Sequence, residues 1–265
     1  MKTCLVIGAK GFIGSAVTAE ATARGYAVLA VDLDTYEAAK GAHVDLLVNA
    51  SGNSFKFVDA QDPMKGFDLS VHSVLNILHD FSYSFFIQLS SGAVYPHEGD
   101  TQQNGESTAL DPPQMTHYGF HKWMAELLVQ HYAPEHLILR MGGFVGPGLR
   151  KNAVYDLLCG GGLFVHPDSR FQYMDTRELA SAVFTLYEGA RKNATLLNIS
   201  SRGTVSLREV AEWAGVGIPP DADVLHRVHA EINVEKIGTL LELPQTLDTI
   251  QRFLRELRHG EIALA

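Results

Sequence analysis

The sequence predicts an α/β fold in which helices cover both faces of a parallel sheet. Short apolar runs of strand length alternate with amphipathic stretches of helical period through most of its 265 residues. The first two apolar runs, Thr3 to Ile7 and Tyr26 to Val31, are joined by a glycine turn and an alanine-rich helix. The hydrophobic share of 46% is large enough for a substantial core.

The glycine turn predicts a dinucleotide-binding, Rossmann-type unit. Glycine at this place lets the backbone approach a pyrophosphate, and the N-terminus of the following helix offers unpaired N–H groups to the anion. The spacing is G-x-x-G-x-x-G, one residue away from the usual fingerprint, so a tight turn without a ligand is the alternative. The predicted cofactor contacts in the turn are Gly8, Gly11, Phe12, Ile13 and Gly14.

Asp32 ends the second predicted strand, about 20 residues beyond the turn, where an acid binds the adenosine ribose hydroxyls. A phosphate on that ribose would meet the carboxylate, so the sequence favours NAD over NADP. The segment after Asp32 is too short for a further strand and helix, which predicts that one element of the usual doubly wound fold is trimmed or missing.

Three further strands are predicted from Val44 to Asn49, Phe85 to Leu89 and Leu137 to Leu139. Helices are expected at Pro63 to Phe81 and about Met115 to Tyr132. Ligands of parallel sheets bind beyond the carboxyl ends of the strands. We therefore expect one cleft to be lined by the residues that follow these strands, including the predicted cofactor contacts Ala50, Ser51, Gly52 and Gly142.

The chain divides into a predicted dinucleotide-binding domain, residues 1–145, and a small C-terminal α/β lobe, residues 146–265, partly interleaved with it. Glycine-rich loops mark the change of texture after Val145. In the lobe we expect a strand at Leu196 to Ile199. The expected helices run from Ala153 to Leu158, Arg177 to Glu188, Ser206 to Ala214 and Thr246 to Leu257.

A tyrosine and a lysine, Tyr118 and Lys122, lie four apart on the predicted helix and so project from one face. An adjacent ammonium favours the phenolate, and we expect it to lower the pKa of Tyr118 into the range of general acid–base catalysis. Ser91 follows a strand that faces the same cleft, where its hydroxyl could hold a substrate oxygen. The alternative is an ordinary surface pair, since Tyr-x-x-x-Lys is common by chance.

Taken together, these motifs resemble the extended short-chain dehydrogenases/reductases of the NAD-dependent epimerase/dehydratase family. The resemblance covers roughly residues 1–215 and rests on Gly8 to Gly14, Ser90 to Tyr95, Tyr118-x-x-x-Lys122, Leu139-Arg140 and Phe144 to Pro147. It implies that Ser91, Tyr118 and Lys122 are catalytic and that Tyr118 and Lys122 also contact the cofactor. It further implies a nucleotide-sugar substrate bound by the C-terminal lobe, and a homodimer formed through a helix bundle.

Two departures from the family narrow the reaction. Sugar-nucleotide dehydratases carry acids after the catalytic hydroxyl residue, where this chain has Gly92 and Ala93, so a dehydratase is disfavoured. Gly143 stands where the family often has asparagine, which weakens the case for a diphosphate contact there. Three hypotheses remain: an NAD-dependent epimerase or oxidoreductase acting on a nucleotide-sugar, a ketoreductase with a non-nucleotide small substrate, and a non-catalytic dinucleotide-binding protein.

Charge and cysteine content bear on partners and location. The formal net charge of −9 argues against nucleic-acid and anionic-membrane surfaces. The two cysteines, Cys4 and Cys159, are expected to be reduced, buried thiols of a cytoplasmic protein. His117 and His121 have the spacing of helical metal ligands, but the sequence suggests no third ligand, and we expect no metal site.

Overall fold

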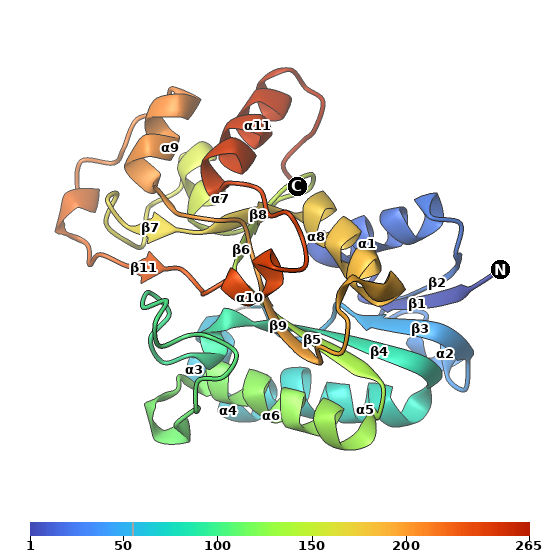
Figure 1. Ribbon diagram of the computed structural model, residues 1–265. Helices are drawn as coiled ribbons and strands as arrows, with labels where there is room; N and C mark the ends of the chain where they lie inside the picture. Colours follow the sequence, from blue (N-terminus) through green and yellow to red (C-terminus); the bar gives the residue numbers. More distant parts are fainter. Residues whose placement is uncertain (55) are drawn as a thin grey trace.

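The computed structural model describes residues 1–54 and 56–265, and within them the fold is built on a six-stranded parallel sheet (Figure 1). The strand order is β2-β1-β3-β4-β5-β9. The α/β fold class predicted from the sequence is therefore confirmed. The strands are β1 Thr3–Ile7, β2 Ala27–Val31, β3 His43–Asn49, β4 Ser82–Ser91, β5 His136–Met141 and β9 Leu196–Ile199.

Helices cover both faces of this sheet. α1 (Phe12–Ala23) and α8 (Thr176–Thr185) lie on one face, and α5 (Ser73–Asp80) and α6 (His117–Tyr132) lie on the other (Figure 1). Leu137 and Leu139 of β5 pack under the first pair of helices, whereas Ile138 packs under the second pair. Because both faces are buried, the strands are continuous apolar runs without polar alternation.

The trimmed element after Asp32 is confirmed. Only the single-turn helix α2 (Tyr36–Ala39) lies between β2 and β3, and β3 pairs with β1 on the side opposite to β2. β2 is consequently an edge strand, and Leu29 on it is 37% exposed. The adenosine side of the predicted cofactor cleft is thus bordered by a short loop and one helical turn.

The region between β3 and β4 forms α3 (Lys56–Gln61), α4 (Pro63–Phe67) and then α5. The predicted continuous helix from Pro63 to Phe81 is interrupted by a π-helical turn, Asp68–His72, which widens the helix before α5 begins. This turn packs against α6, which carries the Tyr118 and Lys122 pair.

The C-terminal lobe has two small sheets and three flanking helices. β6 (Gly143–Val145) pairs with β8 (Tyr173–Asp175), and β7 (Arg170–Phe171) lies between β10 (Val205–Ser206) and β11 (His229–Ala230). The buried side chains of Leu149, Leu207 and Phe253 form part of its core. The flanking helices are α7 (Ala153–Leu158), α9 (Leu207–Ala214) and α11 (Thr246–Arg258).

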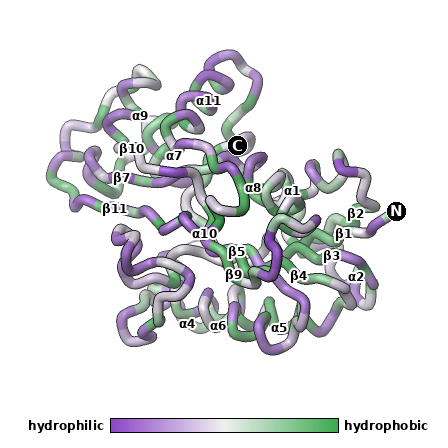
Figure 2. Tube along the Cα trace, viewed as in Figure 1, coloured by the Kyte–Doolittle hydropathy of each residue, from purple (hydrophilic) through white to green (hydrophobic). Residues whose placement is uncertain are grey.

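Two elements from the second half of the chain, α8 and β9, complete the large sheet layer. The single-turn helix α10 (Glu235–Gly238) packs against β9. Figure 2 shows hydrophobic segments gathered along the central strands, and hydrophilic segments on the outer loops and on much of α11. The two halves therefore share one continuous body.

The structure also describes the two cysteines and the lengths of the apolar helices. Both cysteines are free thiols, but only Cys4 is buried. Cys159 is exposed because it caps the C-terminal end of α7, so the expectation of a second buried thiol is wrong. Across residues 1–54 and 56–265, no helix combines the length and the apolar character needed to cross a membrane.

Candidate active site

The glycine turn lies at the carboxyl end of β1. Gly8 has a φ of 78°, in the left-handed region that favours glycine, and its N–H donates to Val31 O at 2.8 Å. A Cβ on Gly14 would lie 2.0 Å from Gly8 O, so only glycine lets α1 start this close to the strand. No side chain caps the N-terminus of α1, and the glycine surface and open N–H groups together fit a pyrophosphate.

Asp32 lies beside this turn. Its Oδ2 accepts a hydrogen bond from the Lys10 backbone N–H at 2.7 Å, which ties the end of β2 to the glycine loop. The Lys10 ammonium forms an exposed ion pair with Asp34. The structure thus brings the predicted ribose-binding carboxylate next to the predicted pyrophosphate turn.

The residues after β3 form the neighbouring wall. Asn49 is completely buried, donates to Gln88 Oε1 at 2.9 Å and accepts from the Ser51 hydroxyl at 2.6 Å. Ala50 O would lie 3.1 Å from a Cβ on Gly8, so this segment runs directly beside the glycine turn. Gly52 has a φ of 112°, and the Lys122 ammonium would lie 3.3 Å from a Cβ at Gly52.

The α6 helix is held tightly against the end of β4. Thr116 caps its N-terminus by accepting from the Gly119 N–H at 3.0 Å. A Cβ on Gly119 would lie 2.0 Å from Ala93 O, and this close contact brings the first turn of α6 up to the Ser91 segment. The structure therefore brings Ser91, Tyr118 and Lys122 together at the carboxyl edge of the sheet.

Within this group, the Ser91 hydroxyl lies beside the Tyr118 phenol. The Lys122 ammonium is 5.5 Å from the centroid of the Tyr118 ring, and both side chains are buried. Ser91 Oγ also accepts from the Ala93 N–H at 3.2 Å, which fixes the hydroxyl at the strand end. The group is arranged to exchange a proton with an oxygen placed beside the phenol.

Burial dominates the protonation of both groups. It raises the pKa of Tyr118 to about 12, although the hydrogen bond from Ser91 acts to lower that pKa. Burial likewise lowers the pKa of Lys122 to about 8, against the opposing charges of Asp59 and Glu126. The expectation that the lysine lowers the Tyr118 pKa is wrong for the ligand-free protein, because desolvation outweighs the charge at this depth.

A buried network that sequence reasoning missed supports this group from behind. Glu126 on α6 accepts from the Ser90 hydroxyl at 2.5 Å and pairs with Arg140 at 2.7 Å. Arg140 also donates to the Tyr95 hydroxyl at 2.9 Å, and Tyr95 in turn donates to Asn198. The network joins β4, α6, β5 and the far strand β9. The sequence motifs include Ser90, Tyr95 and Arg140, but they did not indicate that these side chains meet Glu126.

Gly142 lies just beyond β5, and its N–H donates to Ile199 O at 3.1 Å. A Cβ there would lie 2.6 Å from the buried Ser200 hydroxyl and 3.4 Å from Gln172 Oε1. Packing against these two side chains is enough to account for glycine at this position. Its predicted cofactor contact stays a prediction.

Besides Lys122, a second lysine lies close to the segment after β3. Lys151, from the lobe, donates to Ser54 O at 2.7 Å and to the Ser54 hydroxyl at 2.6 Å. Burial and the nearby charges of Arg150 and Lys122 lower the pKa of Lys151 to about 8. Arg170, by contrast, is exposed, and its guanidinium is engaged by Thr204 and Glu209 on the surface of the lobe.

His117 and His121 both face Asp59. His121 Nδ1 lies 2.6 Å from Asp59 Oδ1, and His117 Nδ1 lies 3.2 Å from the Asp59 carbonyl oxygen. In the part of the chain that the structure describes, no group of three or more potential ligands is arranged to hold a metal ion.

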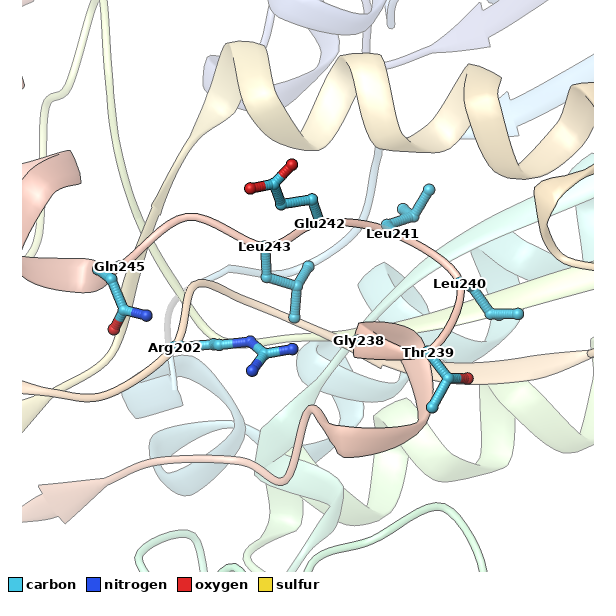
Figure 3. A pocket seen from close by; sticks show the side chains of 8 residues that line it. All are labelled: Arg202, Gly238, Thr239, Leu240, Leu241, Glu242, Leu243 and Gln245. Carbon is cyan, nitrogen blue, oxygen red and sulfur yellow. The ribbon is translucent and has the colours of Figure 1, made fainter.

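A separate open cavity of about 550 Å³ lies beside α10, formed by Arg202 and the segment from Gly238 to Gln245 (Figure 3). The Arg202 guanidinium lies between Gln245 and Gly238. None of the residues predicted to bind cofactor or substrate lines this cavity. It is therefore distinct from the group of residues at the ends of β1, β3 and β4.

The doubly wound sheet, with serine, tyrosine and lysine at its carboxyl edge, defines the chain as an extended short-chain dehydrogenase/reductase. The family model described as the NAD dependent epimerase/dehydratase family matches residues 4–159, and the chain belongs to this family. The resemblance inferred from the sequence motifs is thereby confirmed. No curated protein matches the chain.

Solved structures of nucleotide-sugar enzymes have the same fold. A UDP-galactose 4-epimerase has 19% identity and a TM-score of 0.78, over 97% of this chain and 99% of that chain. MoeE5 in complex with UDP-glucuronic acid and NAD has 18% identity and a TM-score of 0.79, with the same coverage. A dTDP-4-dehydrorhamnose reductase from Bacillus anthracis in complex with NADP has 13% identity and a TM-score of 0.77, over 96% and 98%. At these identities the likeness establishes the fold.

Proposed function

We propose that the protein is an NAD-dependent epimerase or oxidoreductase that acts at a hydroxyl or keto carbon of a nucleotide-sugar. The observation that carries this proposal is the convergence of Ser91, Tyr118 and Lys122 beside the glycine turn. A protein that only binds a dinucleotide needs no buried tyrosine–lysine pair, and burying an ammonium is unfavourable. Structures of the same fold contain UDP-sugars and NAD, which supports the choice of substrate and cofactor.

In the proposed mechanism, Ser91 holds the reacting substrate oxygen and Tyr118 gives or takes the proton on it. Lys122 supplies positive charge next to the phenol and a donor toward the cofactor ribose. The cofactor would be held by the glycine turn, Asp32 and the segment Ala50 to Gly52. NAD, when bound, supplies hydride acceptance and return at the substrate carbon.

The structure adds a steric argument against dehydration. Elimination of water needs an acid and a base beyond the tyrosine. A Cβ on Gly92 would lie 2.7 Å from Ile232 Cγ2, and Ala93 is buried against α6. Neither position carries an acid, and an acidic side chain at Gly92 would require Ile232 to move, so hydride and proton transfer is the chemistry that these residues support.

A ketoreductase acting on a non-nucleotide substrate is the second candidate. Gly143 stands where a diphosphate contact would be expected, but it has no side chain to make one. A Cβ on Gly143 would lie 2.8 Å from Gln172 O. The lobe then relies on Arg150 and Lys151 for any contact with a diphosphate.

Cofactor analysis separates these candidates. Purified protein should be denatured, the released nucleotide identified, and the stripped protein titrated with NAD and NADP. NAD that survives gel filtration at one equivalent supports the epimerase, because an epimerase regenerates its cofactor in each turnover. Reversible NAD binding supports the reductase, and failure to bind either dinucleotide overturns the proposal.

We also propose a homodimer formed through α5 and α6. Leu127 and Tyr132 on α6 and Leu69 just before α5 are each about two-fifths exposed, which leaves apolar surface on the outer side of this helix pair. Light scattering should give twice the mass of one chain, and Leu127→Glu should produce monomers. A monomeric wild-type protein would contradict this assignment.

A further inference from the structure

A buried carboxylate lies directly under the proposed catalytic helix. Asp59, on the short helix α3, is completely buried, and His121 on α6 is 7% exposed. His121 Nδ1 lies 2.6 Å from Asp59 Oδ1, and the Asn53 amide donates to the other oxygen, Oδ2. Each carboxylate oxygen therefore has its own partner, from a different segment of the chain.

The surroundings are shaped around this group. A Cβ on Gly66 would lie 2.5 Å from Asp59 Oδ1, so glycine is required where α4 passes the carboxylate. The Phe67 ring packs edge-on against the His121 imidazole, with 5.8 Å between centroids. A carboxylate taken out of water is destabilising unless it is paired and hydrogen-bonded. His121 and Asn53, from two different segments, meet that requirement here, in a chain that could have buried an apolar residue instead.

The carboxylate connects the two sides of the proposed active site. His121 lies between Tyr118 and Lys122 in the sequence, on the same helix. Asn53 directly follows Gly52, whose Cβ position lies 3.3 Å from the Lys122 ammonium. Asp59 thus fixes the predicted cofactor segment against the helix that carries the proposed acid and base.

Asp59 also acts on both groups through its charge. Among the charged neighbours of Lys122, Asp59 raises the pKa of Lys122 most, followed by Glu126. Lys151 also lies close enough for the Lys122 charge to lower the pKa of Lys151. Asp59 raises the pKa of Tyr118 more than Glu98 does. Within α3, Lys56 is engaged elsewhere, in an ion pair with Glu98. Asp59 is therefore the main negative charge that acts on Tyr118 and Lys122.

We propose that Asp59 is a positioning residue that orients Tyr118 and Lys122, with His121 and Asn53 holding its carboxylate. This inference rests on the proposed function, because it assigns Asp59 a part in that site. Asp59 acts through α6 and through its charge, without touching substrate.

The test is Asp59→Asn, which keeps the shape and the hydrogen-bonding reach while removing the charge. Asp45→Asn is the matched control, since Asp45 lies on β3 at the end far from the site and accepts from Thr3. The titration of Lys122 should be followed by NMR in the ligand-free protein, with its signal assigned by loss in Lys122→Arg. We expect Asp59→Asn to move this titration about 1 pH unit lower. Asp45→Asn should leave it unchanged.

Turnover gives the second readout. The pH profile of kcat should move in the same direction in Asp59→Asn, with the NAD dissociation constant unchanged. A lower melting temperature with an unmoved Lys122 titration would show a merely structural pair and overturn the inference. If the Lys122 titration moves in Asp59→Asn but the wild-type protein has no activity, the charge effect of Asp59 is upheld and the proposed reaction is rejected.

If Asp59→Asn does not fold, His121→Gln decides. This variant keeps the carboxylate charge and removes the imidazole that holds it. We expect about a tenfold loss of kcat without a change in the NAD dissociation constant, because small misplacements of reacting groups are expensive in rate. Wild-type kcat in His121→Gln would overturn the positioning role.

Discussion

Replacing Tyr118 by phenylalanine removes one hydroxyl from the proposed centre. Losing at most one hydrogen bond of this hydroxyl should cost the fold no more than about 1.5 kcal/mol. Loss of a positioned acid–base group slows turnover by about 100-fold to 10,000-fold, equivalent to about 2.7 to 5.5 kcal/mol of activation free energy. We therefore expect Tyr118→Phe to fold and bind NAD normally while losing at least about 100-fold in kcat.

The pKa of Tyr118 adds a pH signature. Burial raises the pKa of Tyr118 to about 12, so the protonated phenol persists well above neutral pH in the ligand-free protein. A step that needs the phenolate, such as oxidation of a hydroxyl carbon, should accelerate as the pH rises, by up to about tenfold per pH unit. Tyr118→Phe should lose this dependence.

The assay is steady-state and single-turnover nicotinamide absorbance across pH, on wild type, Tyr118→Phe and a control. Tyr83→Phe is a suitable control, because burial also raises the pKa of Tyr83 to about 12 and Tyr83 lies at the opposite end of β4. The control should behave as wild type. Turnover of Tyr118→Phe within about tenfold of wild type, or with the wild-type pH slope, would refute the assignment.

Three further substitutions test other parts of the account. Lys122→Met should abolish turnover yet stabilise the fold by about 3 kcal/mol at pH 7, because burial lowers the Lys122 pKa from 10.5 to about 8. Between pH 8 and pH 10.5 the unfolded chain keeps a proton on Lys122 that the folded chain has lost. The destabilisation caused by the buried Lys122 ammonium is therefore complete below pH 8 and disappears above pH 10.5. A lower melting temperature of Lys122→Met at pH 7 would contradict this. Glu126→Gln should cost about 3 kcal/mol in urea unfolding, because it leaves the buried Arg140 uncompensated, and unchanged stability would count against the network. Asp32→Ala should weaken NAD binding and narrow the preference over NADP in calorimetric titrations; unchanged NAD affinity would reject the ribose contact.

The sheet, and the edge at which the residues after its strands meet, could be predicted because they follow from local patterns. Apolar runs of strand length separated by helices specify a parallel sheet, and polar residues after those runs must meet at one edge. The glycine turn, Asp32, Ser91 and the Tyr118–Lys122 pair were each readable on this basis. Even the short connection after Asp32 correctly indicated the missing element between β2 and β3.

The buried residues that hold the site in place could not be predicted, because their contacts join segments that are distant in the sequence. Nothing in the sequence around Asp59 marks an acid that becomes completely buried, since its partners come from α6 and from the loop after β3. The His117 and His121 spacing suggested at most a metal, whereas both rings face one carboxylate-bearing residue. The protonation of Tyr118 was misjudged for the same reason, because helical spacing gives the distance to Lys122 and says nothing of desolvation.

Hydride transfer between NAD and a sugar can be followed by rapid mixing of the NAD-loaded protein with a panel of UDP- and dTDP-sugars, with nicotinamide absorbance as the signal. The account predicts that at least one sugar produces a reduced-nicotinamide signal in wild type. The signal should then decay in an epimerase or persist in a dehydrogenase, and it should be absent in Tyr118→Phe. NAD-loaded protein that gives no reduced nicotinamide with any sugar, or gives an equal signal in Tyr118→Phe, would contradict it.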